Sequence, residues 1–576
     1  MYYSRETSTK LNHLLNYSQT IANDHDVAAM FGYEEQKWFK RVTDVSKLGL
    51  TDANVNDLDA ATNPYKTAGN EIAYTGRSYF GRLNYAYKGK YLFEFNIRRD
   101  GSSRFAPDSR WGTFPSLSAG WRLSEESWLK PVDWVNNLKL RASWGKLGNN
   151  AIDNYEWQSL YSASNYSIGQ ALASGIAITA IANSALSWET TAVTNVGVDY
   201  GFLDNRLTGT VDVYNKLTTG ILYKPDMYMV MGSATAPRQN IAEVTNRGVE
   251  FEIGWRDKIG SDFTYSVKAN FAYNKNFVSK YKGELERGWN EDHTEYTSNI
   301  GDVSTGSTNR VIEGHEINEF YMKNPYKGNG TYFNADGSVN INGGPKDGMI
   351  RTEQDMEWLK AMQAAGYTFQ PYNNIAQNGI WYGEYIYADS NGDGVYGNTH
   401  DSEFQGMSTN PKYNYGLFAS AEYKGFDFSM NWGGSAGFGI YYYRTSTNSS
   451  NTIYGYAIPD DVANDHYFYD PQNPSDPRTN LTSAQPRLVN VSSSQSSTTS
   501  SLHLEKGNFL KLRNLTIGYT IPSQITKKFF VERLRVYASG ENLFAITGFS
   551  GQDPEMRRSI GYSTLRQYAL GVNVTF

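Results

Sequence analysis

Long runs of apolar–polar alternation recur along this chain, and they constrain its fold more than any other feature. Each run is about ten residues long, with an uncharged, largely aromatic face and a polar or charged face. The clearest run sets Phe263, Tyr265, Val267, Ala269, Phe271 and Tyr273 against Thr264, Ser266, Lys268, Asn270 and Asn274. Runs with the same pattern lie at 91–98, 138–144, 249–256 and 426–432. Period-two alternation is typical of β-strands, so the chain is predicted to be all-β.

The length of the runs and of their connections favours a membrane barrel over a secreted, glycan-binding β-sandwich. A strand of about ten residues crosses the apolar layer of a bilayer, whereas strands of soluble proteins average about five or six. Tight turns alternate with long connections: 87–90, 203–206 and 423–426 against 149–188, 216–242, 276–411 and 438–508. Short periplasmic turns opposite long extracellular loops are typical of outer-membrane barrels, and Tyr and Trp near strand ends would form their aromatic girdles. We therefore predict a transmembrane antiparallel β-barrel with large extracellular loops at about 276–411 and 438–508.

The direction of the first and last strands predicts that residues 1–576 are the C-terminal part of a larger barrel. The alternation gives about fifteen strands, or seventeen if 276–411 holds a further pair. Tyr568 to Phe576 alternate to the last residue, which predicts a final strand without a tail. With the tight turns in the periplasm, the strands at 11–17 and 568–576 run the same way, whereas a closed bacterial barrel has an even number of strands. The start at Met1 does not resemble a signal peptide, which agrees with this expectation.

Composition excludes several classes of partner and site. The chain has no cysteine, which excludes disulfides, thiolate zinc sites and cysteine nucleophiles. Lys and Arg number 53 against 59 Asp and Glu, a net charge of −6, and no basic block is present, so no nucleic-acid partner is expected. No stretch approaches the roughly 18 apolar residues of a membrane helix.

Several sequence blocks resemble those of the SusC/RagA-type TonB-dependent outer-membrane transporters of Bacteroidetes. The blocks stand in the family's order: RRDGSSRF at 98–105, WGTFPS at 111–116, GWRLSEE at 120–126, LKLRASWG at 138–145 with GN at 148–149, NRGVE at 246–250, LKLRNL at 510–515, GENLF at 540–544 and GQDPE at 551–555. They are spread over most of the chain, so the resemblance covers it nearly from end to end.

This resemblance implies a 22-stranded barrel of the cell outer membrane, in contact with its lipid and with an N-terminal plug inside. It also implies a SusD-like surface lipoprotein as partner, and energy from the TonB–ExbB–ExbD complex through a TonB box. Neither plug nor TonB box is found in this sequence, so TonB would act through a missing N-terminal region. The expected function is a component of a nutrient importer for glycan (oligosaccharide) or peptide ligands. The alternatives are an outer-membrane binding or adhesion barrel without active transport, or a truncated non-functional fragment.

An acidic motif within 276–411 has the ligand spacing of a calcium loop. Oxygen donors stand at its first, third and fifth positions, a glycine at the sixth and a backbone carbonyl at the seventh: Asp389, Asn391, Asp393, Gly394 and Val395. Asp401 or Glu403 would close the site, since His400 holds the twelfth position, where an EF-hand has Glu. The same motif recurs at this place in the resembled family. We expect a structural Ca²⁺ here, with an Asx-rich turn without metal as the alternative.

We expect no enzyme activity and no catalytic cofactor. The string GGSAG at 433–437 matches G-x-S-x-G, but an aromatic stretch rather than a helix follows it. Glu250 and Glu252 lie two residues apart, which is the spacing that the polar wall of a barrel gives without acid/base chemistry. The seven histidines are scattered, with no zinc spacing.

Two segments rich in Tyr, Trp and Asn are candidates for ligand contacts. They lie at 381–385 and 451–469. Their rings and amides suit sugars or peptides, and they equally suit packing within the loops or contact with a partner lipoprotein. The sequence leaves these alternatives open and assigns no substrate-binding residue.

Overall fold

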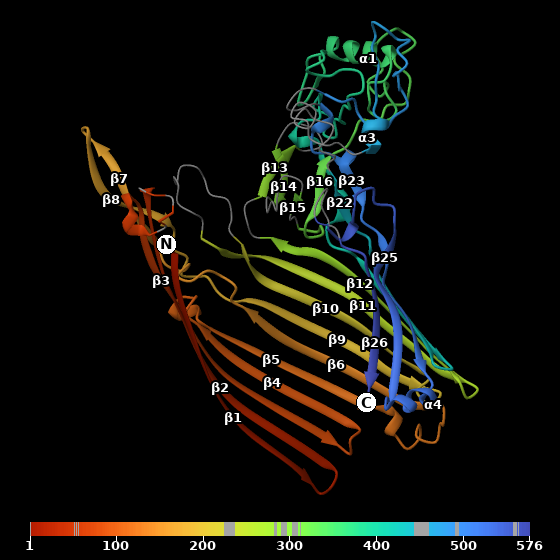
Figure 1. Cartoon of the computed structure of the whole chain (residues 1–576). Coiled ribbons are helices and arrows are strands. Elements are labelled where there is room, and N and C mark those ends of the chain that lie inside the picture. The colour runs from red at the N-terminus through yellow and green to blue at the C-terminus, as the bar shows by residue number, and fades with distance from the viewer. Residues whose placement is uncertain are drawn as a thin grey trace. The chain divides into compact units, whose positions relative to one another are not determined.

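The computed structural model (Figure 1) describes residues 2–50, 52, 54–55, 57–223, 237–281, 285–289, 296–301, 309–310, 313–442, 460–489, 495–556, 562 and 564–576. Parts of the expected loops 276–411 and 438–508, including 451–459 of one aromatic segment, lie outside the described residues. The chain forms two compact units, residues 1–257 with 276–283 and residues 258–275 with 284–576. No helix of the described residues is long and apolar enough to cross a membrane.

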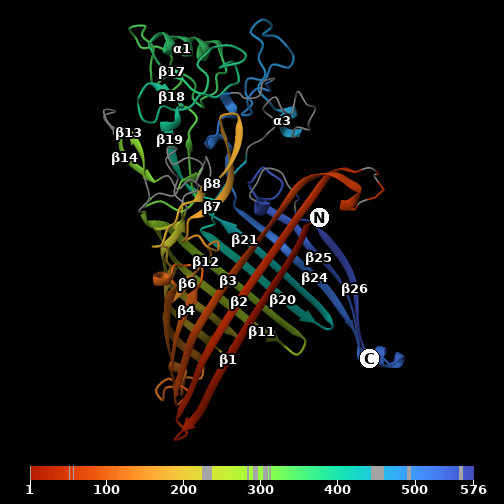
Figure 2. The same cartoon turned by 90° about the vertical axis from the view of Figure 1, so that its left-hand side faces the viewer.

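A 15-stranded antiparallel sheet dominates the described residues, which confirms the all-β prediction and its count of about fifteen strands. Its strands, in order, are β1 (Tyr2–Ile21), β2 (His25–Leu50), β3 (Ala61–Tyr87), β4 (Tyr91–Ser102), β5 (Trp111–Arg122), β6 (Val135–Asn149), β9 (Glu189–Phe202), β10 (Leu207–Tyr223), β11 (Gln239–Ile259), β12 (Phe263–Tyr281), β20 (Tyr413–Tyr423), β21 (Phe426–Ala436), β24 (Phe509–Ile521), β25 (Arg533–Thr547) and β26 (Gln567–Thr575). Strand order follows chain order, so the topology is an up-and-down meander; β1, β2 and β3 lie side by side in Figure 2.

Short elements fill the connections between these strands. They are β7 (Leu160–Ile168), β8 (Ala171–Ala180), β13 (Leu285–Trp289), β14 (Tyr296–Gly301), β15 (Asn309–Arg310), β16 (Glu319–Lys323), α1 (Glu353–Ala364), β17 (Thr368–Phe369), β18 (Val395–Tyr396), β19 (Ser402–Ser408), β22 (Gly439–Tyr441), α3 (Asp460–Asn464), β23 (Leu504–Lys506) and α4 (Ser523–Thr526). The tight turns predicted at 87–90, 203–206 and 423–426 join β3 to β4, β9 to β10 and β20 to β21.

The apolar faces of the strands in the first unit are exposed. Leu83 on β3, Phe93 and Phe95 on β4 and Leu117 on β5 are 41%, 42%, 37% and 42% exposed. A β-sandwich buries this face against a second sheet. The secreted-sandwich alternative is therefore wrong, and the exposed apolar face is the one that lipid would cover.

Two rows of aromatic rings bound the apolar face of the first unit. His13 faces Tyr33 and Tyr33 faces Tyr79 in register, and Trp111 stacks on Tyr79, with ring centroids 6.3, 5.4 and 6.1 Å apart. The second row lies at the tight turns, where His25, Tyr87, Tyr91 and Trp121 face one another in register. Along β3, Tyr79 and Tyr87 enclose a stretch that matches the roughly 9–11 residues of a tilted membrane strand. These rows fit the predicted girdles.

Strand β2 shows where the apolar face of the first unit ends. One of its faces is apolar or aromatic from His25 to Tyr33, through Val27, Ala29 and Phe31. Beyond Tyr33 the same face is mostly charged, with Glu35, Lys37 and Arg41 around Phe39. Pairing with β3 nevertheless continues to Leu50. The uninterrupted apolar stretch of this face therefore ends at Tyr33, while the strand stays in the sheet.

The sequence block at 98–105 builds a small core beside the first unit's long connections. Phe105 is fully buried with Ile152 and Leu186. Arg104 donates from Nη1 to the carbonyl of Asn150 at 3.0 Å, and Asn150 Nδ2 donates to Ser102 Oγ at 3.1 Å. The block at 98–105 thus contacts Asn150, which directly follows the block at 148–149, because the two segments join β4 and β6 to the connections that follow them.

The second unit holds a separate hydrophobic core outside the sheet. Trp358 and Leu359 of α1 are fully buried there with Met349 and Ile350. Thr352 caps α1 reciprocally with Asp355, a capping box that fixes where the helix begins. This helix and core within 276–411 were not predicted from the sequence.

Candidate functional site

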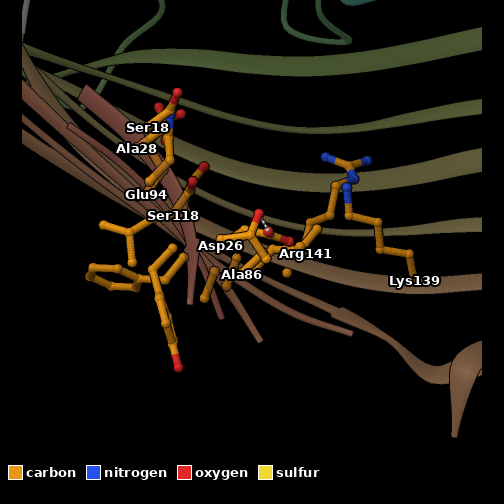
Figure 3. Close-up of a pocket in the computed structure, with 18 of the residues that line it drawn as sticks. Ser18, Asp26, Ala28, Ala86, Glu94, Ser118, Lys139 and Arg141 are labelled. Atoms are coloured by element: carbon orange, nitrogen blue, oxygen red, sulfur yellow. Dashed lines mark hydrogen bonds between the residues drawn. The ribbon is translucent and has the colours of Figure 1, made fainter. Parts of the chain in front are cut away.

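The polar face of the first unit carries a hollow of about 680 Å³ across β1 to β6 (Figure 3). Two adjacent cross-strand rows form its floor: Ser18, Ala28, Asn84, Glu94, Ser118 and Ser143, and Thr20, Asp26, Ala86, Leu92, Gly120 and Arg141. Small side chains such as Ser18, Ala28 and Ala86 leave the space, while Glu94, Lys139 and Arg141 stand around it. The hollow follows from small and long residues alternating across neighbouring strands.

Arg141 is held on this face by two aspartates. Its Nε donates to both oxygens of Asp199 at 2.9 Å, and its Nη1 and Nη2 donate to Asp212 Oδ1 and Oδ2 at 3.1 and 3.0 Å. Bidentate pairs of this kind fix both the position and the plane of a guanidinium. One side chain of β6 thereby joins β9 and β10.

Gly197 makes this bridge possible. It lies in register between Arg141 on β6 and Asp212 on β10. A Cβ at this position would lie 2.4 Å from Asp212 Oδ1 and 2.8 Å from Arg141 Nη2. The guanidinium passes over the glycine, which no other residue would allow without displacement.

The remaining acidic groups of the hollow also have polar partners. Asp26 Oδ1 accepts from Thr20 Oγ1 at 2.7 Å, and Glu94 Oε1 accepts from Asn96 Nδ2 at 2.7 Å. Glu250 lies opposite Asp212 on the neighbouring strand, so the carboxylates noted in the sequence belong to this wall. A hydrophilic wall with partnered charges can pass solutes along it without holding any single one tightly.

The residues of the expected calcium loop adopt a turn held by its own acidic side chains. Asp389 accepts the N–H groups of Gly392, Asp393 and Gly394 at 2.7, 3.1 and 2.9 Å. Asp393 Oδ1 accepts the N–H of Val395 at 2.8 Å. The wrap of N–H groups around Asp389 is compatible with a cation loop, and it equally accounts for a turn without metal.

Asp401 is fully buried beside this turn. It accepts the N–H groups of Ser390 and Asn398 at 2.8 and 2.9 Å, and burial raises its pKa to about 6. No group of three or more His, Asp or Glu side chains placed to hold a metal ion occurs in the described part of the chain, so the three aspartates of the motif are not gathered as ligands. Calcium at Asp389, Asn391, Asp393, Val395 and Asp401 stays a prediction.

The Arg141 bridge and the hollow were not found from the sequence. Alternation places Arg141, Asp199 and Asp212 on polar faces, but the partner of each strand in register is not visible along the chain. The one available signal was Gly197, a glycine within an alternating run, which often marks a close approach.

Comparisons with known proteins agree with this geometry. The family model described as "TonB dependent receptor-like, beta-barrel" matches residues 2–351. TonB-dependent receptor P39 of Formosa agariphila is 28% identical over 592 residues, covering 97% of this chain and 52% of that protein. TonB-dependent receptor SusC of Bacteroides thetaiotaomicron is 29% identical over 575 residues, covering 96% and 48%.

Among solved structures, the RagAB peptide transporter has the same fold. It superposes with a TM-score of 0.73 at 21% identity, covering all of this chain and 56% of that one. The chain spans about half the length of the curated relatives that it matches.

Proposed function

Because the chain belongs to the TonB-dependent receptor-like β-barrel family, and within it to the SusC/RagA type, we propose that it forms barrel wall and loops of an outer-membrane nutrient importer. The solute would pass along the polar face that carries the Arg141 bridge. The importer would take up oligosaccharides or peptides; the RagAB relative is described as a peptide transporter.

The exposed apolar faces of the strands carry this proposal. An apolar band bounded by aromatic rings on one face, and a wall of partnered charges on the other, suit a sheet between lipid and water. A receptor that only binds at the surface has no need of a charged wall along the full strand.

Partners follow from the family. We propose that a SusD-like surface lipoprotein works with the loops of this chain, and that the TonB–ExbB–ExbD complex supplies energy through an N-terminal region of the whole protein. Both partnerships are proposals about the assembled transporter.

Uptake in cells tests the function. A strain carrying the full gene should accumulate a fluorescently labelled oligosaccharide or peptide, and a proton uncoupler should abolish accumulation while leaving surface binding. The chain should fractionate with the outer membrane. Surface binding without uncoupler-sensitive accumulation would instead support a binding or adhesion barrel.

A further inference from the structure

A cavity of about 1130 Å³ lies among the loops of the second unit. Three segments line it, within 377–382, 464–472 and 478–489. Two of them belong to the aromatic segments that the sequence singled out, 381–385 and the described part of 451–469. The fold therefore brings these two segments, far apart in the chain, to one cavity.

The cavity wall is fixed by a buried ion pair. Arg487 donates from Nε to Glu384 Oε1 at 2.9 Å and from Nη2 to the carbonyl of Gln377 at 2.6 Å. Glu384 is fully buried, and its Oε2 accepts the N–H and the hydroxyl of Ser496 at 2.8 and 2.7 Å. The wall is thereby preorganised, which reduces the cost of ordering it when a ligand binds.

A glycine at position 383 lets this part of the cavity wall pack closely against Tyr467. Gly383 has φ +82°, a left-handed conformation that side chains rarely adopt, and a Cβ there would lie 2.4 Å from the Tyr467 ring. Tyr467 is itself anchored, because its hydroxyl donates to the carbonyl of Arg351 at 2.5 Å. The chain can turn at 383 and present Trp381 and Tyr382 to the cavity.

Three of the aromatic rings that line the cavity pack against one another. Tyr382 meets Trp381 and Tyr469 edge-on, with ring centroids 5.4 and 5.0 Å apart. Edge-to-face packing holds each ring at a set angle to its neighbour. Trp381 and Tyr469 are only partly buried, so ring surface remains for a ligand.

The polar lining consists mainly of amides, two paired guanidinium groups and the carboxylate of Asp470, which accepts the N–H of Gln472 at 2.9 Å. Gln377, Asn378 and Gln472 are exposed at the cavity, and each amide both donates and accepts hydrogen bonds. The two guanidinium groups already contact carboxylates, Arg478 that of Asp476 at 2.8 Å and Arg487 that of Glu384 at 2.9 Å. The lining therefore matches a ligand rich in hydroxyl groups better than a charged one.

We infer that this cavity binds a neutral oligosaccharide. Sugar rings offer an apolar C–H face to aromatic rings and hydroxyl groups to amides, and the volume exceeds the roughly 300–1,000 Å³ of common small-ligand pockets, which leaves room for more than one ring. One common mode of peptide recognition, addition of a strand to a sheet edge, does not apply here, because the lining segments lie outside the sheet strands. The inference deepens the proposed import function by naming the class of solute, and in that sense rests on it.

Calorimetric titration of the purified chain in detergent, with no energy source, tests the inference. The probes are maltohexaose, cellohexaose, xylohexaose and mannohexaose, compared with a hexagalacturonate and hexaglycine. Binding of at least one neutral hexasaccharide, tighter than either comparison probe, is the expected result. Failure of all four to bind, or tighter binding of the hexagalacturonate or of hexaglycine, would overturn the inference.

Single substitutions test whether the oligosaccharide binds in this cavity. Trp381→Ala should weaken it at least about tenfold, and Gln472→Ala, an exposed position, about threefold to tenfold. Trp128→Ala removes a 62% exposed tryptophan outside the cavity and should leave the affinity unchanged. Unchanged affinity in both cavity variants would place the site elsewhere.

Uptake and binding separate this inference from the proposed function. Uptake that fails while binding persists contradicts the import function alone, and uptake that persists without binding contradicts this inference alone.

Discussion

The ammonium of Lys511 lies 2.6 Å from the carboxylate of Asp553, and only 7% and 6% of these side chains are exposed. Glu555 lies 2.6 Å from the same nitrogen, and Arg513 pairs with the other oxygen of Glu555 at 2.5 Å. Lys511 and Arg513 stand on β24, and the two acids follow β25. Two sequence blocks of the resemblance, 510–515 and 551–555, therefore meet in one ion cluster.

Lys511→Met should lower the free energy of unfolding by about 3–5 kcal/mol, because Asp553 would remain buried without its cation. Lys424→Met is the matched control: Lys424 is 61% exposed, lies 3.8 Å from Asp262, and should contribute about 0–1 kcal/mol. Chemical unfolding of both variants in detergent or lipid measures the difference. Similar losses in the two would show that the Lys511 cluster is no stronger than a surface pair.

Leu117→Arg and Ser118→Arg test which face meets lipid. Leu117 lies on the exposed apolar face, where arginine should cost about 2–4 kcal/mol near the bilayer midplane. Ser118 is its neighbour on β5 and lines the hollow of the polar face, so arginine there should be tolerated much better. Unfolding in lipid vesicles compares the two, and the reverse order would invert the assigned faces.

Gly197→Ala should push Arg141 away from Asp212. The added methyl group would overlap both side chains, an overpacking that costs about 1–3 kcal/mol. Gly548→Ala, where a Cβ would meet nothing within 4 Å, is the control. Gly197→Ala should melt at a lower temperature than Gly548→Ala. Equal melting points would mean that Arg141 and Asp212 shift aside without loss of stability.

Glu384 should make the loop core of the second unit depend on pH. Burial raises the pKa of this carboxyl, although Arg487 lowers it in part. Stability from a group with a raised pKa is complete below the unfolded value of about 4.3 and is lost as pH rises through the folded value. Protease resistance of the loops should therefore fall as pH rises above about 4, because ionising the buried Glu384 costs more than its pair with Arg487 returns, and it should fall less in Glu384→Gln. Parallel profiles for the two proteins would rule this dependence out.

Calcium should protect the loop that contains Asp389. If the carboxylates of Asp389 and Asp393 take up the ion, added Ca²⁺ should raise the melting point and slow proteolysis near 389–401. Mg²⁺, which demands smaller octahedral geometry, should do so less. The double variant Asp389→Asn, Asp393→Asn should not respond. Absence of any calcium effect on the parent chain would leave an Asx turn without metal.

The sequence predicted the strands because alternation is local, and it missed the contacts that depend on pairing. Phe93 and Phe95 could be assigned to one face from their spacing. The meeting of Arg141 with Asp212 depends on the register of three strands, which the spacing does not carry. The core around Trp358 and the cavity beside Trp381 depend on segments more than a hundred residues apart, joined by contacts such as that of Arg487 with Glu384.

The apolar stretch of one face of strand β2 ends at Tyr33, but the strand stays paired with β3 as far as Leu50. At about 3.3 Å per residue, the paired strands continue for roughly 56 Å from Tyr33 to Leu50. Beyond Tyr33, the face of β2 that is apolar near the tight turn carries Lys37 and Arg41, with Phe39 between them. A single hydrogen-bonded ribbon therefore has an apolar face that suits lipid at one end and a mostly charged face that suits water at the other.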